Sequence, residues 1–123
     1  MDLCEEAIAL FCRDQGVVLA PDAGPLVRLA LRDIGTVQFE RHAGQLTFWL
    51  AFAVVESQRD RAMLGTLTRV YSARAPLQPL RCGMLANGDL VLMVSLDEDR
   101  VSAQQLHETY RLLNAVRAEV LDA

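Results

Sequence analysis

The sequence predicts an α+β fold in which three helices accompany a twisted antiparallel β-sheet. Five short segments have the length and composition of strands, and the first two of them alternate apolar and polar residues. Three longer segments repeat apolar residues with the period of an α-helix. Their order along the chain is helix, three strands, helix, two strands, helix. At 123 residues, with no repeat or linker-like stretch, the chain is expected to form a single domain, residues 1–123.

The first helix is predicted over residues 2–15. Asp2 can cap it, with Glu5 three residues later as in a capping box, and Gly16 can end it. Its apolar residues cover an arc of about 200°, whereas a surface helix needs a stripe of only about 100°. Two explanations stay open: the helix is covered by a partner as well as by its own sheet, or it is sunk in the core of its own domain.

Three strands are predicted after a turn at Pro21–Gly24. Short connections around Gly35 and Gly44 favour an antiparallel meander. These strands cover residues 27–31, 37–40 and 45–55.

The third of these strands is apolar on both faces. Phe48 and Leu50 would point to one side of the sheet, and Trp49 and Ala51 to the other. Three helices are too few to cover both sides of such a sheet. Some of this apolar surface is therefore expected to contact another chain.

The second half of the chain begins with a predicted helix over residues 56–75, which Pro76 and Pro79 end. One face of this helix is apolar, and it either packs on the domain's own sheet or contacts a second subunit. The residues of that face are Met63, Leu64, Leu67, Val70 and Tyr71.

The last three elements are two strands and a helix. Residues 80–85 and 90–96 flank Asn87-Gly88, a dipeptide typical of a type I′ hairpin turn. Ser102 can cap the last helix, and Gln105 follows it at the third helical position. The apolar face of this helix consists of Leu106, Tyr110, Leu113, Val116 and Val120.

Composition excludes several classes of protein. The net charge of −4 and the pI of about 5.1 argue against a nucleic-acid-binding protein, which needs a basic surface. The N-terminus lacks the basic start of a signal peptide, and the longest apolar run, residues 48–55, is too short to cross a bilayer. Cys4, Cys12 and Cys82 form no disulfide or zinc pattern, which is typical of a reducing cytoplasm.

No group of residues predicts an active site, a metal site or a cofactor site. His42 and His107 are expected to be surface residues, and Asp97-Glu98-Asp99 a solvated turn, because this acidic run lacks the alternating ligands and glycine of a calcium loop. Cys82 is expected to be a buried structural thiol. An enzyme is not expected; a small hydrolase or transferase using Cys82 or His107 is the alternative within that class.

Six segments, spread over nearly the whole chain, carry a resemblance to a known family. The segments are Phe11–Val17, Gly35–His42, Leu46–Ala51, Leu80–Gly83, Leu90–Glu98 and Glu119–Leu121. In order and spacing they resemble class I type III secretion chaperones of the CesT/Tir-chaperone kind, which have the element order α-β-β-β-α-β-β-α. Within that family the sequence is most similar to the SycN type.

The resemblance implies a small cytoplasmic bacterial chaperone that works without ATP or any cofactor. It implies a heterodimer with a YscB-like small chaperone, bound to the extended N-terminal region of a YopN-like secreted gatekeeper. A position at the inner membrane, beside the secretion apparatus, is also implied. No nucleic acid and no membrane insertion are expected.

The resemblance also assigns roles to two sets of residues, by element rather than by a fixed motif. Contact with the secreted protein is expected from Leu3, Ile8, Phe11, Leu29 and Leu31. Contact between subunits is expected from Leu64, Leu67, Tyr71 and Leu80. The alternatives are a homodimeric effector chaperone and a small dimeric α/β scaffold of the roadblock or longin kind.

Overall fold

The computed structural model describes residues 2–18, 24–70 and 80–122. The first half contains α1 (Leu3–Asp14), β1 (Leu26–Leu31), β2 (Gly35–His42) and β3 (Gln45–Phe52). A short 3-10 turn, Glu56–Gln58, leads into α2 (Arg59–Val70). The second half contains β4 (Leu80–Met84), β5 (Leu90–Asp97) and α3 (Ala103–Asp122). The predicted α+β fold and its order of elements are confirmed.

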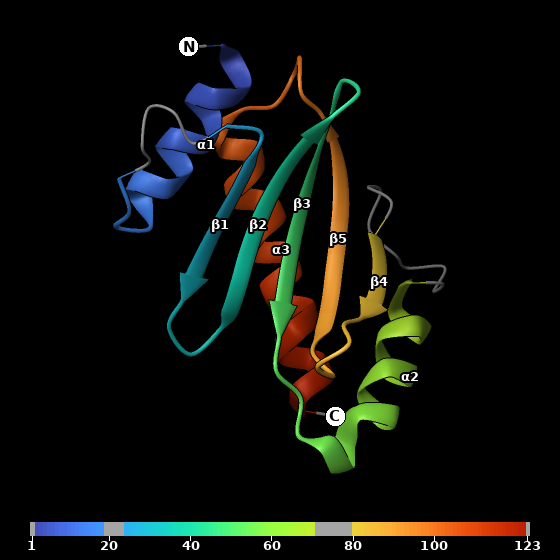
Figure 1. The fold of residues 1–123 in the computed structure, drawn as a ribbon. Coiled ribbons are helices and arrows are strands. Elements are labelled where there is room, and N and C mark those ends of the chain that lie inside the picture. The colour runs from blue at the N-terminus through green and yellow to red at the C-terminus, as the bar shows by residue number, and fades with distance from the viewer. Residues whose placement is uncertain (1, 19–23, 71–79, 123) are drawn as a thin grey trace.

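The five strands form one antiparallel sheet in the order β1-β2-β3-β5-β4 (Figure 1). The first three strands form the predicted meander. β5 then pairs with β3 over its whole length, from Gln45 opposite Asp97 to Phe52 opposite Leu90. β1 and β4 are therefore the two edge strands.

Helices α1 and α3 cover one face of this sheet, behind the strands in Figure 1. Phe11 of α1 contacts Phe39 and Phe48 edge-to-face, with ring centroids 5.5 and 5.8 Å away, and it is fully buried. The covered face of β3 consists of Leu46, Phe48, Leu50 and Phe52, all of which are buried. The core of the protein lies in this layer.

The helix ends follow the predicted capping. The side chain of Asp2 accepts a hydrogen bond of 2.8 Å from the backbone N–H of Glu5, and Gly16 follows α1 with a positive φ of 82°. Ser102 accepts a bond of 3.1 Å from the N–H of Gln105 at the start of α3. Helix α1 thus begins and ends where its local sequence specifies.

Two local features differ from the prediction. β3 ends at Phe52 instead of continuing to residue 55, because its partner strands begin at Gly35 and Leu90 and offer no hydrogen bonds beyond that point. The β4–β5 hairpin exists, but Gly88 alone has positive φ there, and its N–H donates to Leu85. The type I′ prediction is therefore wrong for this turn.

Parts of two predictions lie outside the described residues. These are most of the Pro21–Gly24 turn, and the end of the second predicted helix with Tyr71, Pro76 and Pro79. Within the described ranges, none of the helices has the length and apolar character that a membrane span requires.

Candidate protein-binding surfaces

Helix α1 presents an exposed apolar edge beside its buried face. At 100° per residue, Leu3 and Leu10 lie at one side of the apolar arc, while Cys4, Ile8 and Phe11 lie toward its middle and far side. The sheet and α3 bury that middle, whereas Leu3 and Leu10 remain 53% and 40% exposed. The wide arc thus serves two surfaces: most of it is core, and one edge is open to a partner.

The residues predicted to contact a secreted protein fall into two groups. Leu3 is exposed and Leu31 is half-buried, so a partner can reach both. The side chains of Ile8, Phe11 and Leu29 are buried in the core, where they support α1 and β1 from below. These buried residues therefore support the binding surface without contacting a partner directly. The exposed residues of α1 and β1 are the ones available for contact.

Strand β1 adds a second kind of binding feature to this region. It is an edge strand that pairs only with β2 among the described residues, so one side of its backbone offers N–H and C=O groups for a further strand. An extended segment of another protein can pair with such an edge, and its side chains can reach a neighbouring apolar surface.

Helix α2 turns two of its large apolar residues, Leu64 and Leu67, outward, whereas Met63 and Val70 pack against the core. Its buried side consists of the small residues Ala62 and Thr66, and Thr66 donates to the carbonyl of Ala62. Leu64 and Leu67 are 66% and 37% exposed. Packing on the domain's own sheet therefore does not account for these two leucines, which remain available to a second subunit.

The other two residues predicted for the subunit contact lie elsewhere. Leu80 is buried in the core at the start of β4, next to α2. Tyr71 lies outside the described residues. Leu64 and Leu67 are thus the exposed part of the predicted subunit contact.

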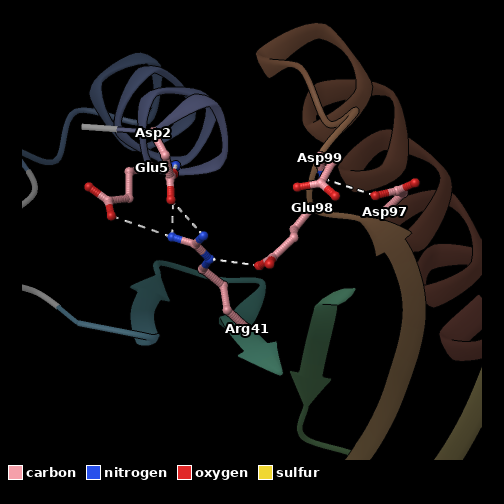
Figure 2. Close-up of polar contacts among 6 residues, drawn as sticks. All are labelled: Asp2, Glu5, Arg41, Asp97, Glu98 and Asp99. Carbon is pink, nitrogen blue, oxygen red and sulfur yellow. Dashed lines mark hydrogen bonds and ion pairs between the residues drawn. The ribbon is translucent and has the colours of Figure 1, made fainter. Parts of the chain in front are cut away.

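Arg41 fixes the N-terminal end of α1 to the sheet (Figure 2). Its Nη2 donates to Asp2 Oδ2 at 2.7 Å, its Nη1 lies 3.5 Å from Glu5 Oε1, and its Nε donates to Glu98 Oε2 at 3.0 Å. One half-buried guanidinium on β2 thus joins the first turn of α1 to the connection between β5 and α3. The hydrogen bonds to Asp2 and, next in size, to Glu98 raise the pKa of Arg41.

The pKa of Asp2 is lowered, first by the hydrogen bond from the N–H of Glu5 and then by the bond from Arg41. A carboxylate with a lowered pKa stabilises the fold above its unfolded pKa, and this contribution is lost as the pH falls through the folded value. Wild type should therefore unfold at higher urea concentration than Asp2→Asn at pH 7, and the two midpoints should converge below pH 3.8. In an Arg41→Gln background, the difference that Asp2→Asn makes to the urea midpoint should be smaller at pH 7. A difference in midpoint between wild type and Asp2→Asn that is as large at pH 2 as at pH 7 would contradict this account.

The other end of α1 is fixed by His107, whose Nε2 lies 2.9 Å from Asp14 Oδ2. The His107 ring also lies 5.0 Å from the ring of Phe11. His107 is half-buried and not the surface residue that the sequence predicts, because α3 packs along α1 and brings together two residues that are 93 positions apart. His42 is exposed, as predicted.

The three thiols are free and differ in burial: Cys4 and Cys12 are buried, and Cys82 is half-buried. Burial raises the pKa of each one, which lowers the fraction of reactive thiolate. Within the described ranges, no three His, Cys, Asp or Glu side chains gather as metal ligands would.

Sequence comparison identifies the family. A model of the family described as type III secretory system chaperone SycN matches residues 3–121. The chaperone protein SycN of Yersinia enterocolitica is 37% identical over 121 residues, which are 98% of each chain. That of Yersinia pseudotuberculosis serotype I is 36% identical with the same coverage. The family is one of secretion chaperones and not of enzymes.

Solved structures support the fold at lower sequence identity. A chain of the heterodimeric ExoU–SpcU complex, from the type III secretion system of Pseudomonas aeruginosa, has a TM-score of 0.68 at 20% identity, covering 94% of this chain and 95% of that one. The Yersinia pestis type III secretion chaperone SycH, solved with a fragment of YscM2, has a TM-score of 0.66 at 14% identity, covering 94% and 98%. The fold and the full-length sequence match agree, and the chain belongs to the SycN family of type III secretion chaperones.

Proposed function

We propose that this chaperone pairs with a second, YscB-like small chaperone, and that the pair binds the extended N-terminal region of a YopN-like secreted gatekeeper. The bound segment would be kept soluble and competent for export, and its release would contribute to the control of secretion. The observation that carries this proposal is the presence of two exposed apolar surfaces on different elements, one on α1 and one on α2.

The α1 surface suits an extended ligand. Leu3 and Leu10 are seven residues apart, which is about 10 Å along a helix, and an extended chain covers that distance in about three residues. Apolar side chains of the ligand would cover these leucines, while its backbone pairs with the edge of β1. Because Arg41 and His107 hold the two ends of α1, the surface is already formed before the ligand arrives.

The mechanism is passive. A disordered ligand loses conformational entropy on binding, and burial of apolar surface over a large area has to offset that loss. The chaperone therefore contributes shape and apolar area, and no step of bond-making or bond-breaking. The proposed place of action is the bacterial cytoplasm, including the cytoplasmic side of the inner membrane at the secretion apparatus.

The proposal is tested by tagging the chain in its native host and identifying the co-purifying proteins by mass spectrometry. One second small chaperone and one secreted protein are expected. Deletion of the N-terminal region of that secreted protein should remove it from the complex and leave the two small subunits paired. Unchanged recovery of the deleted form would contradict binding through that region.

A further inference from the structure

One face of the sheet is not covered by a helix in the described part of the chain. α1 and α3 lie behind the strands in Figure 1, and α2 lies beside β4. The strand register aligns one row of side chains across all five strands on the opposite, uncovered face. In order from β1 to β4, this row consists of Arg28, Gln38, Trp49, Met93 and Arg81.

Within the described residues, the two ends of this row are cations without carboxylate partners. Arg28 Nε and Nη2 both donate to the amide oxygen of Gln38 at 3.1 Å, and Arg81 Nη2 donates to Ser95 Oγ at 2.9 Å. Among the described residues, no acidic side chain forms an ion pair with either arginine. Arg41, by contrast, has three carboxylates around it.

The middle of the row is apolar and half-buried. Trp49 and Met93 are neighbours on β3 and β5, with Ala51 and Val91 beside them in the next row of the same face. A surface with an apolar centre and an arginine at each side is complementary to a segment with an apolar middle and acidic ends.

We infer that this face receives a helix of the second subunit, laid across the strands, with its apolar middle on Trp49 and Met93 and a carboxylate toward each end for Arg28 and Arg81. The inference rests on the proposed pairing with a second chaperone. Four strand spacings give the row a length of about 19 Å. A helix of twelve residues, the length of α2, is about 18 Å long and matches it.

The same charges disfavour a second copy of this chain as the partner. Its own α2 has the required length and the exposed Leu64 and Leu67, but Arg59 and Arg61 lie in its first turn. Arg69 in its last turn is paired with Glu119 at 2.9 Å. In a two-fold symmetric dimer each subunit would place its α2 on the uncovered sheet face of the other, so the arginines of α2 would lie next to Arg28 and Arg81. Asp60 is the only acidic residue of this helix, although the whole chain has a net charge of −4. Charge thus selects a different subunit with an acidic helix.

The test reverses the charges at both ends of the row. The purified chain with R28E and R81E should form a homodimer whose dissociation constant at 50 mM NaCl is at least tenfold lower than that of wild type. The reason is that the new carboxylates face the basic α2 of a second copy. Analytical ultracentrifugation measures both dissociation constants. This gain should shrink at 500 mM NaCl, where salt screens the pairs. R100E with R111E, which makes the same change in net charge on the side of α3, is the control and should leave self-association unchanged. Circular dichroism verifies folding.

The milder variant R28Q with R81Q keeps the test decisive if the double glutamate variant does not fold, and it should give a smaller gain in self-association. Equal dissociation constants for wild type and both row variants would overturn the inference. If the second small chaperone still co-purifies with the tagged chain and binds the row variants as tightly as wild type, the inference fails and the proposed pairing stands. Absence of any second chaperone would refute the pairing itself.

Discussion

Replacing Phe11 by alanine is expected to lower the free energy of unfolding by about 3–5 kcal/mol, the cost typical of removing a large buried aromatic side chain. Phe11 is fully buried, and its ring lies within 6 Å of the rings of Phe39, Phe48 and Tyr110. The deletion would leave a cavity where α1, α3 and the sheet meet. For a domain of this size the loss is a large part of the total stability. Urea denaturation followed by circular dichroism measures it.

Leu3→Ala is the matched control on the same helix. Leu3 is 53% exposed, so its truncation should change the free energy of unfolding by less than about 0.5 kcal/mol. It should nevertheless weaken binding of the secreted protein, because Leu3 belongs to the exposed edge of α1. If Phe11→Ala were as stable as wild type but failed to bind, the assignment of Phe11 to the core would be wrong.

Leu64→Asp is expected to disrupt subunit pairing while leaving the fold intact. Leu64 is 66% exposed on α2, and an aspartate there would place an unpaired charge in the apolar centre of the proposed contact. Substitution of a central apolar residue at an interface costs about 2–4 kcal/mol, which corresponds to a loss of affinity of about 30-fold to 1,000-fold. Isothermal titration of the two purified subunits measures the change.

Ala118→Asp provides the control for that change. Ala118 is an exposed residue of α3, so Ala118→Asp has a helix-propensity cost at least as large as that of Leu64→Asp, at a position away from α2. Pairing should be unaffected by Ala118→Asp. Equal losses of affinity in the two variants would show that the effect of Leu64→Asp is general and that α2 is not the contact.

The sequence was sufficient to predict the elements whose signals are local. Asp2 and Ser102 cap their helices as their positions in capping motifs predict, and the alternation of residues in β1 and β2 places their side chains on the correct faces. These features depend on neighbours two to four residues away. The same locality explains why the α-β-β-β-α-β-β-α order could be derived before the structure.

Contacts between distant residues had no such signal. Arg41 and Glu98 are 57 residues apart, and nothing in either segment predicts their ion pair. The pairing of His107 with Asp14 depends on how α1 and α3 pack, which the sequence pattern of neither helix specifies. These contacts hold both ends of α1, so the rigidity of the proposed ligand surface became visible only in the fold.

The binding surfaces illustrate a further limit of periodicity. On α1 the helical arc is correct, but it does not separate the buried Phe11 from the exposed Leu3. On α2 the predicted apolar stripe is divided: Met63 and Val70 pack against the core, whereas Leu64 and Leu67 are exposed. The small residues Ala62 and Thr66 form the side that lies against β4 and α3. Whether an apolar residue of a helix belongs to the core or to an interface depends on which side of that helix packs against the rest of the domain.

The central claim is that this chain acts as one half of a pair of different chaperones around one secreted protein. Native mass spectrometry of the complex purified from its host tests it most directly. The account predicts a mass equal to one copy of this chain, one copy of a second small chaperone and one secreted protein. A complex that contains two copies of this chain and no second chaperone would contradict it.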